Sequence, residues 1–266
     1  MDTSNRVFSL GFAFLAAAVA TAGWGRSARA DAAAEGLAVA KKADAANAGF
    51  KSETSTLKMD LINAHGDVTE RKMVIETLEG TDDGDRSRAV FEWPADVKGT
   101  KLLTFTHRKG DDDQWLYLPA IKRVKRISSN NKSGSFMASE FAYEDLGSQE
   151  VEKYTYKLLS EEKLEGRDTW KIQRVPLDKK SGYKRQVVWM DKQYMNPLRI
   201  DYYDRKDELL KTAVFSQYQK FGKYWRAGKI DMRNAQTKKR SVLTWEKRSL
   251  GAKLDPAVFE STALEE

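Results

Sequence analysis

The feature that most constrains this chain is a long series of short strand patterns separated by turn residues, running from position 52 to 249. Most segments alternate apolar and polar residues or are rich in β-branched and aromatic residues, and Gly, Asp and Asn occupy many of the gaps. We expect strands at 55–63, 69–79, 86–93, 101–108, 114–118, 123–127, 151–159, 169–176, 183–191, 197–204, 209–221, 224–234 and 239–249. No linker rich in Gly, Ser or Pro divides them, and the whole chain has only 5 prolines. The sequence therefore predicts one continuous antiparallel sheet.

A sheet of about ten or more strands rarely stays flat, so this one is expected to curl strongly or to close. Strand alternation places a set of large apolar residues on one face, which we predict to be the inner face. This set comprises Met73, Ile75, Phe91, Trp93, Leu103 and Phe105. A single helix is predicted over 32–48, with a narrow stripe that includes Val39 and Ala43. Because one such helix cannot cover the sheet, either its two halves cover each other or the sheet lines an apolar cavity.

The first thirty residues resemble a cleavable signal peptide. Arg6 precedes an apolar run at 7–23, and Ala28-Arg29-Ala30 offers small residues to a signal peptidase. The alternative is a transmembrane anchor, although the run is short and rich in Ala. Without any cysteine the chain has no lipidated N-terminal Cys. We therefore expect residues 1–30 to be a leader and 31–266 to form a single exported, soluble domain.

The composition argues against several classes of function. The 46 basic residues are interspersed with 39 acidic ones, which does not favour a nucleic-acid binder. Zero cysteines exclude disulfides and thiolate chemistry. The acidic runs beside His107 match no metal-binding loop, and no nucleophile elbow or phosphate-binding motif occurs. A hydrolase that pairs His107 with a neighbouring aspartate is the remaining catalytic alternative. We expect a structural His107, no catalytic residue, no metal and no cofactor.

Two stretches are distinctive. Positions 115–127 contain a strand that is apolar on both faces, a proline stop and a basic strand with Arg123, Lys125 and Arg126. These cations form either a solvated face or a contact for a lipid headgroup or an acidic partner. Positions 133–147 combine small residues with Phe136, Met137 and Phe141, among other large apolar residues, which is typical either of a flap over a site or of a loop that covers the core.

These stretches, together with Trp93-Pro94 and the segment 99–103, resemble the outer-membrane lipoprotein-sorting proteins of the LolA/LolB-like superfamily. The resemblance extends over roughly positions 37–259. It implies an incomplete antiparallel barrel with a helical lid, whose apolar hollow holds acyl chains. It also implies periplasmic residence, no catalysis, and a link with resistance-nodulation-division (MMPL-type) exporters. The arginine that latches the lid in LolA is not assigned to any residue here.

The sequence thus predicts a periplasmic carrier for the acyl chains of a lipoprotein or lipid, moving towards the outer membrane. The predicted lining is Met73, Ile75, Phe91, Trp93, Leu103, Phe105 and Trp189, with Phe136, Met137 and Phe141 as the flap. The alternative is a non-catalytic periplasmic adaptor of an RND/MMPL-type transporter, with a filled core and no ligand.

Overall fold

The computed structural model describes residues 24–265, and the burial of side chains over residues 31–265. Positions 1–23 of the predicted leader lie outside the described residues. The division into a leader and one mature domain therefore stays a prediction. Within the described residues, no helix is long and apolar enough to cross a membrane.

The chain is mainly β, with one α-helix at its start. The helix α1 spans Trp24–Asn47. The strands are β1 (Ser52–Ile62), β2 (Val68–Leu78), β3 (Arg86–Trp93), β4 (Lys101–Phe105), β5 (Asp113–Leu118), β6 (Arg123–Ile127), β7 (Tyr154–Leu164), β8 (Arg167–Pro176), β9 (Tyr183–Asp191), β10 (Pro197–Asp204), β11 (Leu209–Ser216), β12 (Gln219–Phe221), β13 (Tyr224–Arg226), β14 (Lys229–Asn234) and β15 (Arg240–Leu250). Short 3₁₀ turns, including Phe136–Ala138 and Tyr143–Asp145, punctuate the connection between β6 and β7.

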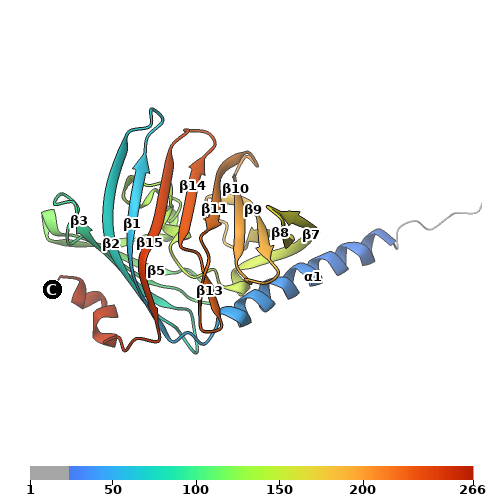
Figure 1. Cartoon of the computed structure of the whole chain (residues 1–266), viewed down its shortest axis with the longest axis horizontal. Coiled ribbons are helices and arrows are strands. Elements are labelled where there is room, and N and C mark those ends of the chain that lie inside the picture. Colours follow the sequence, from blue (N-terminus) through green and yellow to red (C-terminus); the bar gives the residue numbers. More distant parts are fainter. Residues whose placement is uncertain (1–23, 266) are drawn as a thin grey trace, which may run out of the picture.

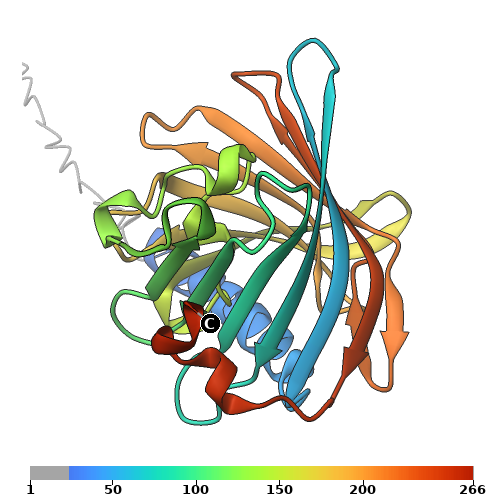
Figure 2. The ribbon, with the colours of Figure 1, turned by 90° about the vertical axis from the view of Figure 1, so that its left-hand side faces the viewer.

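Thirteen strands form a single antiparallel sheet in the order β6-β5-β4-β3-β2-β1-β15-β14-β11-β10-β9-β8-β7. The two ends of this order, β6 and β7, are not paired with each other, so the sheet curls into an incomplete barrel (Figures 1 and 2). The predicted fold class, a strongly curved antiparallel sheet with a helical lid, is confirmed. Strong curvature is the expected outcome for twisted strands in so wide a sheet.

Three segments cover the sheet. Helix α1 runs along β7 and beneath the β8–β11 side of the molecule (Figure 1). The connection between β6 and β7, which we call the loop 128–153, folds over the concave face between the two ends of the sheet. The C-terminal segment, residues 251–265, crosses the outside of β3–β5 (Figure 2), where Phe259 and Leu264 are fully buried. The concave face and its covers form the main core.

Two predicted strands are interrupted in the structure, and several others, such as 101–108 and 151–159, differ in their bounds. The chain predicted as 209–221 breaks after β11, and the chain predicted as 224–234 breaks after β13, so that β12 and β13 pair with each other in a separate two-stranded sheet. Gln217 has a positive φ of 56° at the first break. Tyr218 lies in the first break, and aromatic residues occur in both β12 and β13, so the pattern of large residues did not reveal the interruptions. Helix α1 also begins eight residues before the predicted start at 32.

Candidate functional site

An apolar hollow of about 410 Å³ lies between α1 and the concave face of β8–β11 and β14. Its floor is a row of cross-strand neighbours, one from each strand: Ile172, Val188, Ile200, Ala213 and Met232. All five are at most 5% exposed. The volume falls within the range of roughly 300–1,000 Å³ that is usual for small-molecule sites. Since protein interiors normally fill such space, the hollow is a candidate site for an apolar ligand.

Small residues on α1 leave this space open. Ala40 and Ala43, three positions apart on one face of the helix, line the hollow. Gly36, one turn earlier, lies against the backbone of β7. A Cβ atom there would lie 2.7 Å from the Leu158 nitrogen. The helix therefore approaches the sheet closely without filling the space beneath it.

The other half of the concave face is filled by the loop 128–153. Phe136 is 1% exposed and packs on Phe91 of β3, with ring centroids 5.7 Å apart. Its ring also contacts Tyr143 at 5.7 Å in an edge-to-face arrangement. The guanidinium of Arg71, on β2, donates a hydrogen bond to the carbonyl oxygen of Met137. These contacts hold the loop against β2 and β3, where Phe136 fills the space above Phe91.

A buried ion pair joins the loop to the floor of the hollow. Lys211 Nζ, on β11, donates to Asp145 Oδ2 at 2.6 Å, and their side chains are only 4% and 5% exposed. Asp145 also accepts hydrogen bonds from the Tyr183 hydroxyl at 2.8 Å and from the Ala142 amide at 2.7 Å. Burial raises the pKa of Tyr183 well above its usual value, so its hydroxyl remains a donor. A charge pair satisfied in this way fixes the position of the loop.

The structure divides the predicted lining between the two halves. Phe141 lines the hollow. Met73, Ile75 and Phe91 belong to the filled half, where Met73 and Phe91 are each 1% exposed. Phe136 and Met137, predicted as flap residues, pack in the same half.

Four of the predicted lining residues lie elsewhere. Leu103 and Phe105 face outward and pack beneath the C-terminal segment. Trp189 also faces away from the hollow, with its indole N–H donating to Glu162 Oε1 at 2.7 Å. Trp93 is 49% exposed, beside a break in the register between β2 and β3. The prediction that these four residues lie on the inner face is therefore wrong. For Leu103, Phe105 and Trp189 the physical reason is that β4 and β9 are apolar on both faces, so alternation does not reveal which face is concave. For Trp93 it is the shift in register after Phe91, which breaks the alternation of β3.

The cations predicted to contact a headgroup or partner lie on the edge strand β6. Arg123, Lys125 and Arg126 are all exposed. Arg126 forms an ion pair with Asp113 and lies 6.0 Å from the centroid of the Trp115 ring. None of the three lines the hollow. Their contact with a headgroup or a partner stays a prediction.

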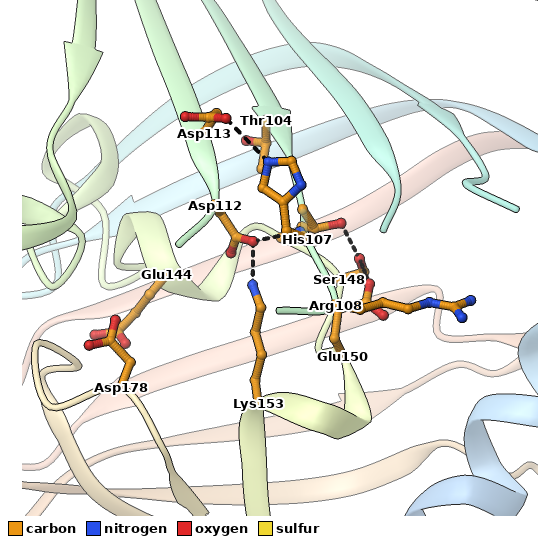
Figure 3. Close-up of polar contacts among 12 residues, drawn as sticks. Thr104, His107, Arg108, Asp112, Asp113, Glu144, Ser148, Glu150, Lys153 and Asp178 are labelled. Atoms are coloured by element: carbon orange, nitrogen blue, oxygen red, sulfur yellow. Dashed lines mark hydrogen bonds and ion pairs between the residues drawn. The ribbon is translucent and has the colours of Figure 1, made fainter. Parts of the chain in front are cut away.

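His107 is held by carboxylates at the turn between β4 and β5 (Figure 3). Its Nδ1 lies 2.6 Å from Asp83 Oδ2, and its Nε2 lies 3.2 Å from Asp113 Oδ2. The hydrogen bond with Asp83 is the main cause that raises the pKa of His107. Because both ring nitrogens face carboxylates, neither is placed to activate a hydroxyl nucleophile.

The same turn lines a second, polar pocket of about 360 Å³ between the two ends of the sheet. Asp112 pairs with Lys153 at the start of β7 and accepts a hydrogen bond from the His107 amide (Figure 3). Lys132 pairs with Asp178 across the same space. Gln149 lines both this pocket and the hollow. Within residues 24–265, no group of three or more His, Asp or Glu side chains is arranged to hold a metal ion.

The sequence analysis placed Ala43 on the apolar stripe of the helix but did not predict that Ala40, Ala43 and the floor row line a site. One signal was present at Val187-Val188-Trp189-Met190, where apolar residues occupy both faces of β9. From it we selected Trp189 for its size, whereas the structure turns Val188 and Met190 towards the hollow. The small residues of α1 give no sequence signal of their own, because they matter only for the volume that they leave.

Comparison with known structures identifies the fold. A domain from Vibrio parahaemolyticus, described as an outer membrane lipoprotein-sorting protein domain, is 45% identical with a TM-score of 0.86, covering 88% of this chain and 100% of that one. A LolA superfamily protein from Nitrosomonas europaea is 19% identical with a TM-score of 0.69, covering 86% and 98%. No curated protein matches the chain. The chain therefore has the fold of the LolA-like proteins.

A narrower assignment follows from a second structure. A DUF1329 family protein from Desulfovibrio piger is 34% identical with a TM-score of 0.84, covering 88% of this chain and 99% of that one. A family model described as "Uncharacterized protein" also matches residues 83–266. The chain belongs to the DUF1329 family.

Proposed function

We propose that this protein is a non-catalytic periplasmic carrier that binds the acyl chains of a lipoprotein or lipid in the hollow, for transport towards the outer membrane. The observation that carries the proposal is the vacant apolar space of about 410 Å³ beneath α1. Removing one methylene group from water contributes about 0.8 kcal/mol, so a long acyl chain supplies ample affinity. The lipoprotein-sorting description of the Vibrio parahaemolyticus domain supports the same direction of transport.

The covering elements support release as well as binding. Helix α1 lines the hollow with Asp44, Asn47 and two alanines, which contribute little buried area each, and the loop 128–153 is fastened at a few identifiable points. A partner that moves either element would open the hollow. The exporter partner that the family resemblance implies is part of this proposal, and Arg123, Lys125 and Arg126 remain the candidate contacts.

The test fills the hollow from α1. Ala43→Phe should occupy space that the ligand needs, and we expect at least about tenfold weaker binding of the apolar fluorophore N-phenylnaphthylamine, since displacing two methylene equivalents costs about that much. Mass spectrometry of lipid extracted from protein purified from its native envelope should show less lipid with this variant.

Ala45→Phe is the matched control, because Ala45 lies on the exposed side of the same helix and does not line the hollow. It should bind the fluorophore as the unchanged protein does. If both variants and the unchanged protein carry no lipid and bind no fluorophore, the carrier proposal fails and the adaptor alternative replaces it.

A further inference from the structure

A row of polar residues crosses the floor beside the apolar row. Tyr156 pairs with Arg174, Arg174 with Gln186, Gln186 with Tyr202, and Tyr202 with Lys211, each on the neighbouring strand. Each of the four members on β8–β11 is two positions along its strand from the corresponding apolar floor residue, a spacing of about 7 Å. Alternation places both rows on the same face of the sheet. Along the strands, the floor of the hollow therefore changes from an apolar row to a polar row.

Two members of this row are partly satisfied by the protein. Lys211 is neutralised by Asp145. Gln186 accepts a hydrogen bond from Arg174 Nε at 2.5 Å. These contacts leave three groups of the row that also line the hollow: the hydroxyls of Tyr156 and Tyr202 and the terminal nitrogens of Arg174.

The two hydroxyls have no hydrogen-bond partner within residues 24–265, although Tyr156 and Tyr202 are only 9% and 6% exposed. In the described chain, Arg71 Nε is the one side-chain nitrogen or oxygen that lacks a partner and is also fully shielded from solvent. Neither tyrosine oxygen is therefore sealed within the protein, and the open space that both residues line is the hollow. Both hydroxyls are thus available to donate a hydrogen bond to a ligand oxygen in the hollow.

Arg174 supplies a positive charge at the same place. It forms no ion pair with any residue of the described chain, and its guanidinium lies 4.8 Å from the centroid of the Tyr154 ring. Two carboxylates also line the hollow: Asp145, which is paired with Lys211, and Asp44 on α1, whose pKa is raised chiefly by burial. Burial raises the pKa of both tyrosines, so their hydroxyls stay protonated and able to donate.

The structure assigns this corner, formed by Arg174, Tyr156 and Tyr202, to the carbonyl end of a bound acyl chain. The inference rests on the proposed function and deepens it by naming the head of the ligand and its orientation. A guanidinium and two hydroxyl donors suit the oxygens of a carboxylate or of an acyl ester. The chain would then extend over the apolar row towards Met190 and Pro197, which line the hollow two positions further along β9 and near the start of β10.

The experiment measures the affinities of palmitic acid, methyl palmitate and hexadecanol for the purified protein. We expect the two carbonyl ligands to bind more tightly than the alcohol. Arg174→Met should weaken binding of palmitic acid by about tenfold to a hundredfold, as expected for losing a charge-assisted hydrogen bond, and should leave hexadecanol within about threefold. A preference for the acid over its ester assigns the corner to a free carboxylate, and equal binding assigns it to an esterified chain.

Tyr202→Phe removes one hydroxyl with little risk to the fold and should weaken both carbonyl ligands by about threefold to tenfold. Tyr203→Phe is the matched control, because Tyr203 faces the other side of the same strand against Arg185. If hexadecanol binds as tightly as palmitic acid, and neither Arg174→Met nor Tyr202→Phe alters their ratio, the inference is wrong while the carrier proposal stands. If no ligand binds, the carrier proposal itself fails.

Discussion

The two halves of the concave face have similar walls and different contents. Over β2 and β3 the loop 128–153 inserts Phe136, and this half is filled. Over β8–β11 and β14 the cover is mainly α1, which presents Ala40 and Ala43, together with Phe141 at the margin of the loop, and about 410 Å³ stays open. Both walls are rows of buried apolar residues, so the sheet does not decide whether space remains. The covering segment decides it, through the size of the residues that it turns inward.

The largest effect on stability is expected at the ion pair between Lys211 and Asp145. This pair joins the loop 128–153 to the floor of the open half. Lys211→Met leaves Asp145 buried without its cation, and we expect a loss of about 3–5 kcal/mol in the free energy of unfolding. Chemical denaturation measures this loss. Combining it with Asp145→Leu should recover part of the stability, because the uncompensated charge is removed. A loss below about 1 kcal/mol in the single variant would mean that the halves are joined by other contacts.

Matched methionines compare the two halves directly. Met73 on β2 and Met232 on β14 are each 1% exposed, but only Met232 lines the hollow. Met73→Ala should lower the free energy of unfolding by about 2–5 kcal/mol. Met232→Ala should lower it by about 1–2 kcal/mol less, because a side chain beside open space has fewer packing partners to lose. Urea unfolding of both variants checks the difference. Equal losses would contradict the distinction between a filled and an open half.

The filled half should also respond to pH. Asp85, in the turn between β2 and β3, has a pKa raised to about 6, chiefly by burial, with smaller contributions from neighbouring acids. The pKa of Asp85 is higher in the folded protein than in the unfolded chain. Ionisation of this carboxyl therefore lowers the free energy of unfolding as pH rises through about 6. Asp85→Asn should therefore increase the free energy of unfolding by about 1–2 kcal/mol near pH 8 and have almost no effect near pH 4. An equal increase in the free energy of unfolding at both pH values would show that ionisation of Asp85 is not the cause of the effect.

The smallest effect is expected at His107. Its pKa is raised by the hydrogen bond with Asp83, so its contribution to stability is present below its unfolded pKa and is lost as pH rises through the folded value. The ring is 32% exposed, so we expect less than about 1 kcal/mol. Thermal unfolding of His107→Gln should approach that of the unchanged protein as pH increases from about 6 to 8. A catalytic role would instead predict loss of a measurable turnover.

The sequence predicted the fold better than the site. Turn residues and alternation gave the strands Arg86–Trp93, Arg123–Ile127, Tyr183–Asp191 and Pro197–Asp204 with their observed bounds, because these depend on local patterns. The site depends on which face becomes concave. Leu102 and Leu103 are both buried, one inside and one beneath the C-terminal segment, and no local pattern distinguishes them. The hollow itself depends on alanines of α1 meeting strands more than a hundred residues later in the chain.

The close approach of Gly36 to β7 has a consequence beyond the shape of the hollow. As the last strand of an open sheet, β7 has one side on which no other strand pairs with it, and such an edge is a template for pairing with another molecule. The lack of a side chain at Gly36 lets α1 lie against the β7 main chain at Lys157 and Leu158. The helix thereby covers a strand edge on which another molecule could otherwise pair, while about 410 Å³ beneath the same helix stays open.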